Sequence, residues 1–251
     1  MAFYASYRNE LTKLLARKKY FVFLFAGIAL CLLWTGLIIL WDYWLYDYGI
    51  RLFSFGNTPK AMLPFFLQVI VPFLTFMAVT DLITVEDADN TMKAMICRPV
   101  ERWKLFSSKI LAILTYAAIY LACVYIISTV LNQLFGVRQS VPDLIWDLIS
   151  YALTLIPLAI LASYSALIAL IGRSASMTMF LLLLSYILLS FLPILYPILS
   201  EMLFTSYLSW YRLWIGAIPQ AAKMVHMTLI ILGSGVVFFT SGSLLFDRKE
   251  Y

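Results

Sequence analysis

The chain has 251 residues, of which 63% are hydrophobic and only 12% are charged. A soluble domain has roughly 45–50% apolar and about 25% charged residues. Because a folded domain buries at most roughly three quarters of its surface, a water-soluble fold could not cover this much apolar surface. The composition therefore predicts a protein embedded in lipid and excludes a secreted enzyme, a nucleic-acid-binding domain and a disordered tail, although the net charge is +5.

Six apolar stretches are long enough to cross a bilayer, whose roughly 30 Å hydrocarbon core needs about 20 residues of helix. They cover residues 20–41, 61–80, 106–131, 147–171, 177–199 and 224–246. The first stretch follows a basic segment, but its 22 residues exceed the about 7–15 of a signal-peptide core. We therefore predict an all-α integral membrane protein with a single transmembrane domain over residues 1–251.

Lysine and arginine are divided unevenly between the segments that connect these spans. Thirteen of the eighteen lie in residues 1–19, in the loops after the second and fourth spans, or after the sixth span. The remaining five lie on the opposite side. Because connections rich in Lys and Arg stay in the cytosol, we expect both termini to be cytosolic.

Residues 1–19 are predicted to form an amphipathic helix. An apolar stripe at helical spacing is formed by Phe3, Tyr7, Leu11, Leu14 and Lys18. A basic amphipathic helix of this kind lies flat on an anionic membrane surface. It would act either as a general anchor or as a lever that contacts a cytosolic partner.

A second, short amphipathic helix is predicted over residues 84–98, between the second and third spans. Thr84 is a possible N-cap, and Glu86 lies in the first turn, where the helix dipole favours anions. Arg98 lies in the last turn, and Pro99 ends the helix. Its apolar face comprises Val85, Ala88, Met92, Met95 and Ile96. Such a helix either rests on the membrane surface or inserts into a groove of a cytosolic protein.

The stretch from Glu86 to Lys109 resembles the cytosolic loop of ABC type-2 (ABC-2) permeases. In that family an acidic residue precedes Gly-Thr-Leu, and Pro-Val-x-Arg and a lysine at the third span follow. The matching positions are Glu86, Thr91, Met92, Pro99, Val100, Arg102 and Lys109. Asn90 stands where the family has Gly, and Asn also tolerates a positive φ. The six spans and both charged ends fit the same family, so the resemblance covers essentially the whole chain.

The resemblance implies a non-catalytic permease subunit of an ATP-driven exporter in a bacterial plasma membrane. Residues 84–98 would be the coupling helix that docks onto a separate ATPase, residues 1–19 the connecting helix, and residues 201–221 an extracellular re-entrant segment. The working transporter would contain two permeases, identical or homologous, and two ATPase subunits that hold ATP and Mg²⁺. The ATPase contact is assigned to Glu86, Asp87, Asn90, Thr91, Met92, Met95, Arg98, Pro99 and Arg102. The connecting helix is assigned Tyr7, Leu11, Leu14, Arg17 and Lys18.

The sequence lacks a GxxxxGK[ST] motif, so we do not expect this chain to bind ATP itself. It has a single histidine, His226, so we do not expect a metal site, and no cofactor is assigned to this chain. Gln68 is the clearest deep polar side chain and is assigned to a possible translocation path. Ion-coupled carriers place ionisable groups near the middle of the membrane, and their scarcity here favours an external source of energy. It also favours a hydrophobic or amphipathic substrate. The compact permeases that this chain resembles often export bacteriocins, lantibiotics or toxin-like peptides, so a peptide is preferred.

Two other classes of function remain open from the sequence. The first is a channel or secondary carrier, which would move its substrate without an ATPase. The second is a membrane-embedded enzyme of Mg²⁺-dependent prenyl transfer, with ligands from Asp81, Glu86, Asp87 and Asp89. Such enzymes typically have two facing acidic clusters, and this sequence has one.

Overall fold

The computed structural model describes residues 2–46, 58–89, 91–92, 101–135, 138–196, 203–214 and 221–249, without the side chains of residues 2, 41–46 and 221–223. These ranges contain helices and no strand. In chain order the elements are α1 (Ala2–Ala16), α2 (Lys18–Tyr46), α3 (Thr58–Phe65), η1 (Phe66–Ile70), α4 (Val71–Val79), η2 (Thr80–Val85), α5 (Glu86–Ala88), α7 (Arg102–Phe135), α8 (Val141–Leu153), α9 (Leu155–Ile171), α10 (Ala175–Leu195), η4 (Phe204–Leu213) and α11 (Ala221–Arg248).

Six helical stretches are long and apolar enough to cross a membrane. They are Lys18–Leu40, Thr58–Ala88, Arg102–Phe135, Val141–Ile171, Ala175–Leu195 and Met224–Arg248. The second stretch is built from α3 to α5 with η1 and η2, and the fourth from α8 and α9. The predicted all-α fold class with six spans is therefore confirmed.

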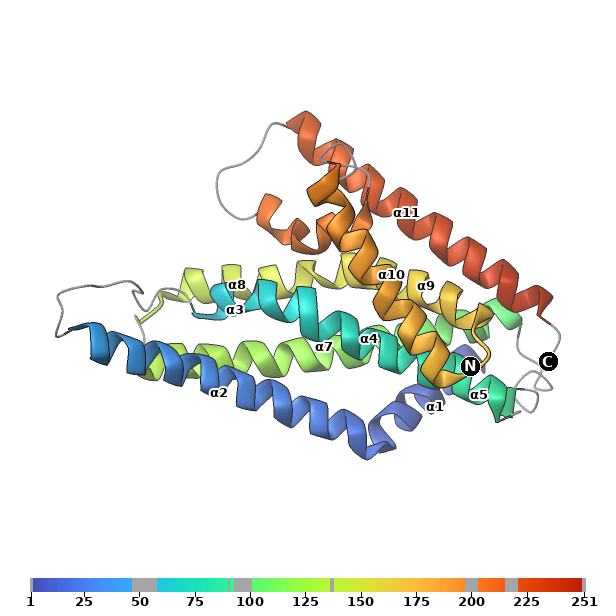
Figure 1. The fold of residues 1–251 in the computed structure, drawn as a ribbon, viewed down its shortest axis with the longest axis horizontal. Helices are drawn as coiled ribbons and strands as arrows, with labels where there is room; N and C mark the ends of the chain where they lie inside the picture. Colours follow the sequence, from blue (N-terminus) through green and yellow to red (C-terminus); the bar gives the residue numbers. More distant parts are fainter. Residues whose placement is uncertain are drawn as a thin grey trace.

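The second and fourth spans form the centre of the bundle, and the first, fifth and sixth cover its outside. Figure 1 shows α2 and α7 side by side along the length of the molecule, with α10 and α11 oblique to them. The outer spans expose large apolar side chains such as Phe25, Phe180 and Val237. Hydrocarbon tails are the natural solvent for such a surface, because the backbone polar groups within a helix are largely bonded to one another.

The end of the bundle that holds α1 also holds α5 and the end of α11 (Figure 1). Helix α1 turns away from α2 at Arg17 and packs across α7. Helix α11 packs along α9. Segments that are far apart in the sequence thus meet at one end of the molecule, beside the start of the loop that connects the second and third spans.

Two π-helical segments, η1 and η2, interrupt the second span. Pro72 has no N–H group to donate to the carbonyl of Gln68, four residues earlier. The Tyr186 hydroxyl of α10 donates to that carbonyl instead, at 2.8 Å. The N–H of Val71 bonds to the carbonyl of Phe66, five residues back, which is the π pattern. The irregular backbone is therefore satisfied by a neighbouring span.

The second span continues past the point where the sequence suggested a new helix. Thr84 is not an N-cap, because it lies within η2 and its hydroxyl is buried. That hydroxyl donates to the carbonyl of Ala169 at 3.1 Å and lies 3.3 Å from the Thr178 hydroxyl. The helix goes on through α5, and Thr91 and Met92 are also helical. Residues 90 and 93–98 of the expected coupling helix lie outside the described residues.

The segment expected to be re-entrant, residues 201–221, contains the 3₁₀ helix η4 with a break at Ser209. Phe204, Tyr207, Trp210 and Tyr211 are buried in the contacts that η4 makes with neighbouring helices such as α9 and α11, whereas Trp214 is 44% exposed. The ring of Phe204 contacts those of Tyr164 and Phe238 at centroid distances of 5.0 and 5.3 Å. Residues 201, 202 and 215–220 lie outside the described residues, so the re-entrant path stays a prediction.

Candidate functional site

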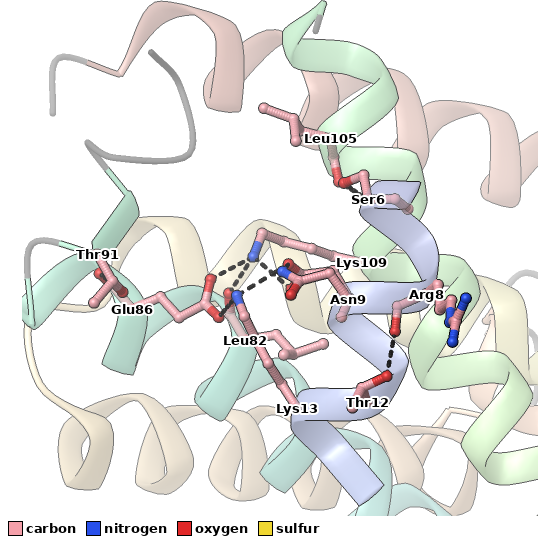
Figure 2. Close-up of polar contacts among 12 residues, drawn as sticks. Ser6, Arg8, Asn9, Thr12, Lys13, Leu82, Glu86, Thr91, Leu105 and Lys109 are labelled. Carbon is pink, nitrogen blue, oxygen red and sulfur yellow. Dashed lines mark hydrogen bonds and ion pairs between the residues drawn. The ribbon is translucent and has the colours of Figure 1, made fainter. Parts of the chain in front are cut away.

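A group of four buried or half-buried charged residues joins three separate helices at the α1 end of the bundle. We call Glu10, Lys13, Glu86 and Lys109 the Lys109 cluster (Figure 2). Glu10 and Lys13 come from α1, Glu86 from α5 and Lys109 from α7. The cluster lies where the second span leads into the loop that resembles the ABC-2 motif.

The Lys109 ammonium group is 1% exposed and has three acceptors within hydrogen-bond distance. It donates to Glu10 Oε2 at 3.0 Å, to Glu86 Oε2 at 2.5 Å and to the Leu82 carbonyl at 2.9 Å. Since an ammonium group has three N–H donors, the geometry uses all of them. A buried charge is tolerated only when it is paired and hydrogen-bonded in this way.

Lys13 completes the cluster from the water-facing side. Its ammonium group donates to Glu86 Oε1 at 2.6 Å and to Glu10 Oε1 at 3.0 Å. Two carboxylates and two ammonium groups therefore alternate, and the cluster has no net charge. Burial lowers the pKa of Lys13, but the hydrogen bond to Glu86 and the two carboxylate charges outweigh it, so the pKa is raised above its usual value. Lys13 thus stays charged at physiological pH.

A second ionic contact ties the turn between α1 and α2 to the same span. Asp81 of η2 is buried. Its carboxylate accepts hydrogen bonds from Lys19 and from the Tyr20 hydroxyl, both at 2.6 Å, and Arg17 lies 3.0 Å away. Both Asp81 and Glu86 are therefore held by basic residues from the N-terminal 20 residues of the chain.

The residues assigned to the connecting helix lie mostly against the bundle. Leu14 is fully buried, Leu11 is partly buried, and the Tyr7 hydroxyl lies 2.9 Å from Thr115 Oγ1 on α7. Arg17 pairs with Asp81, whereas Lys18 is exposed. The apolar stripe of α1 thus packs on protein.

The residues assigned to the ATPase contact do not all lie on one surface. Glu86 is buried in the Lys109 cluster, and Met92 is also buried. Thr91 is exposed, and its hydroxyl donates to the Glu86 carbonyl at 3.1 Å. Asp87 pairs with Lys249, and the Arg102 guanidinium donates to the Asp247 carbonyl. Asn90, Met95, Arg98 and Pro99 lie outside the described residues.

The sequence reasoning did not single out Glu10. One signal could have found it, because Glu10 is the only acidic residue among the first 19 and lies three positions before Lys13. An isolated carboxylate in a basic amphipathic helix needs a partner when its side of the helix is buried. Lys109, near the start of the predicted third span, is a lysine that also needs a partner if it is buried.

Gln68 lies elsewhere, on a polar cavity of about 560 Å³ between the second span, α10 and η4. The cavity has hydroxyl groups from both sides, with Tyr186 and Ser190 on α10 and Thr205, Ser206 and Ser209 on η4. Gln68 itself is exposed on the surface of the bundle. Because polar side chains seldom face lipid tails, we expect this face to meet water or another protein surface.

The sequence was also compared with known proteins. A family model described as ABC-2 family transporter protein matches residues 7–189. The chain belongs to the ABC-2 family of transporter proteins. A comparison with curated proteins gave no match. The region that matches the ABC-2 model contains the whole Lys109 cluster and ends within α10, before η4 and α11.

Members of the ABC-2 family are the membrane components of transporters, and their partner is an ABC ATPase. Within the described residues, no group of three His, Cys, Asp or Glu side chains is placed to hold a metal ion. The geometry of the Lys109 cluster, with each carboxylate paired to an ammonium group, suits a fastening between helices.

Proposed function

We propose that this chain is the permease subunit of an ATP-driven exporter in a bacterial plasma membrane. The α1 end of the bundle faces the cytosol, two ATPase subunits dock there, and a second permease, identical or homologous, completes the transporter. The observation that carries this proposal is the Lys109 cluster, which fastens the start of the coupling loop to α1 and α7. The ABC-2 family match supports the same assignment.

The mechanism follows from that fastening. Lys109 and Glu86 are both buried, so separating them would leave an uncompensated charge in a medium of low dielectric constant. The start of the loop therefore moves together with α1, the second span and α7. When ATP closes the ATPase dimer, a docked loop transmits the displacement as a rigid-body movement of packed helices. ATP has to bind one of the two arrangements more tightly for this to occur.

The proposed cargo is hydrophobic or amphipathic, most simply a peptide. The cavity at Gln68 offers one amide and several hydroxyl groups, and no charged residue is among those that line it. Its volume of about 560 Å³ is in the range of ligand cavities, roughly 300–1,000 Å³. Neutral hydrogen-bonding groups beside apolar walls suit peptide backbone and apolar side chains better than an inorganic ion.

The contacts of the acidic residues weigh against the prenyl-transfer alternative. Asp81 and Glu86, which would have to hold Mg²⁺, each accept hydrogen bonds from lysine side chains instead. Binding of a divalent cation would require the displacement of those ammonium groups.

The docking of the ATPase can be tested at Ala88, which is exposed at the tip of the second span. Ala88 has no side-chain polar group to lose, so Ala88→Trp adds bulk without breaking a bond of the chain. We expect the amount of ABC ATPase that co-purifies with the tagged variant from its native membranes to fall about tenfold or more below that of the parent. A loss of about 1.4 kcal/mol of binding free energy has this effect.

The matched control is Val141→Trp, which places the same residue at a position that is 70% exposed at the opposite end of the bundle. This variant should retain the ATPase as the parent does. Equal retention by Ala88→Trp and Val141→Trp would contradict docking at this end.

A further inference from the structure

A third ionic contact involves Asp87, the neighbour of Glu86 on α5. The Lys249 ammonium group donates to Asp87 Oδ2 at 2.7 Å and to the Leu170 carbonyl at 2.8 Å. We call Asp87, Leu170 and Lys249 the Lys249 cluster. It joins three segments that are distant in the sequence, namely the end of the second span, the end of α9 and the residue that follows α11.

Each contact in the Lys249 cluster satisfies a group at a helix end. Leu170 is one of the last four residues of α9, and the carbonyls of a last turn have no partner within their own helix. A cation there is also favoured by the helix dipole. In the same way, the Arg102 guanidinium at the start of α7 donates to the Asp247 carbonyl in the last turn of α11.

Two neighbouring carboxylates therefore hold different helices. Glu86 binds Lys109 and Lys13, on α7 and α1, whereas Asp87 binds Lys249 beyond α11. Successive residues of a helix point about 100° apart, which follows from 3.6 residues per turn. Thr84 adds a further bond from the second span to the end of α9, at the Ala169 carbonyl.

We infer that Lys249 is a positioning residue that transmits displacement of the coupling loop to the fourth and sixth spans. The bonds described for the Lys109 cluster join α1, α7 and the Leu82 carbonyl of the second span, and none of these bonds reaches α9 or α11. Through Asp87 and Leu170, Lys249 links those two spans to the same loop, and α11 packs along α9 so that they move together. This inference rests on the proposed function, since it needs an ATPase to displace the loop.

The Lys249 cluster differs from the Lys109 cluster in its exposure to water. The side chains of Lys249 and Asp87 are 26% and 29% exposed, so water screens their attraction. A screened pair contributes little to overall stability, so its loss should leave the fold intact. Loss of Lys249 should therefore affect transmission more than folding.

The test uses the purified complex with its ABC ATPase in lipid nanodiscs. The native cysteines are replaced, and an environment-sensitive fluorophore is attached at Val237→Cys, an exposed position on α11. The measured quantity is the fluorescence change on addition of ATP and Mg²⁺. The retained ATPase is measured in the same samples, as the readout of docking.

We expect Lys249→Met to reduce the ATP-driven fluorescence change by roughly two- to thirtyfold, the range of substitutions that weaken coupling between sites. Retention of the ATPase should be unchanged. Lys249→Arg should keep the response, because a guanidinium can still reach Asp87. The double variant Asp87→Lys with Lys249→Glu should recover part of it.

The matched control is Arg248→Met. It also removes one positive charge, but at the neighbouring residue, whose side chain is exposed. A full response in Lys249→Met with normal ATPase retention would contradict this inference alone. The same conclusion would follow if Arg248→Met and Lys249→Met lost the response equally, or if Lys249→Met failed to retain the ATPase. A parent complex that retains no ABC ATPase would instead contradict the proposed function.

Discussion

Lys109 shows how a single residue can hold helices together in a membrane, where the hydrophobic effect does not favour one pairing of helices over another. Within a bilayer, apolar surfaces pack against lipid nearly as well as against each other, so polar contacts contribute much of the specificity between helices. The Lys109 side chain is almost wholly buried, yet each of its three N–H donors has an oxygen acceptor, one on α1 and two on the second span. Its loss would leave Glu10 and Glu86 in a buried site with Lys13 as their shared partner.

We predict that Lys109→Met lowers the free energy of unfolding by about 3–5 kcal/mol, the usual cost of removing one partner from a buried ion pair. The measurement is the thermal transition of the purified chain in detergent. Lys104→Met is the control, because Lys104 pairs with Glu101 through side chains that are 36% and 60% exposed. Exposed pairs contribute at most about 1 kcal/mol, so equal losses in the two variants would show that the Lys109 cluster is not a buried fastening.

The residues of this site were only partly predictable from the sequence. Glu86 and Lys109 stood out because they match the ABC-2 motif, and Arg17 because of its place in the basic helix. Their partners could not be assigned, because a contact such as Glu10 with Lys109 spans 99 positions. Periodicity along one helix carries no information about such a contact, which depends on how α1 lies across α7.

At the scale of elements, the close approach of α2 to α7 depends on one glycine. A Cβ atom built on Gly27 would lie 2.3 Å from the Tyr120 hydroxyl oxygen and 2.8 Å from the ring carbon that bears it. Both distances are shorter than any real contact, so a side chain at residue 27 would force the two helices apart or turn the tyrosine ring. A Cβ atom built on Gly36, on the same helix, would have no other atom within 4 Å outside its own stretch of helix.

We predict that Gly27→Ala destabilises the chain by about 1–3 kcal/mol, as overpacking does. Gly36→Ala should be neutral or slightly stabilising, because alanine has the better helix propensity. Tyr120→Phe should recover part of the loss, since it removes the nearest atom, and among the described residues that hydroxyl has no hydrogen-bond partner. Thermal transitions of the three single variants and the double variant would check this, and no rescue by Tyr120→Phe would disprove the contact.

The number and type of the elements could be predicted because a spanning helix must be long and apolar, whatever its neighbours are. The interruptions of the second span could not. Pro72 alone predicts a bend, but the π-helical geometry of η1 also depends on Tyr186, which lies more than 100 positions away and satisfies the Gln68 carbonyl. Similarly, Thr84 is of a residue type that is common at N-caps, but its hydroxyl donates a hydrogen bond to a carbonyl of α9.

At the scale of the whole molecule, the two ion-pair clusters lie at the same end of the bundle. The end that holds α1, α5 and the end of α11 contains both the Lys109 and the Lys249 clusters (Figures 1 and 2). The segments that the sequence predicts to be cytosolic carry thirteen of the eighteen basic residues. The excess of lysine and arginine that predicts the orientation thus includes side chains that hold the spans together.

This coincidence makes the orientation testable with two cysteine variants in a chain whose native cysteines are replaced. Ala88→Cys lies at the tip of the second span, and Arg138→Cys lies in the connection between α7 and α8, and both side chains are exposed. With a membrane-impermeant maleimide on intact cells, we expect labelling of Arg138→Cys and at least about tenfold less labelling of Ala88→Cys, because the charge rule places residue 88 inside. In detergent the two should be labelled equally, which calibrates their reactivity. Strong labelling of Ala88→Cys on intact cells would place the coupling loop outside, where no ATPase could reach it.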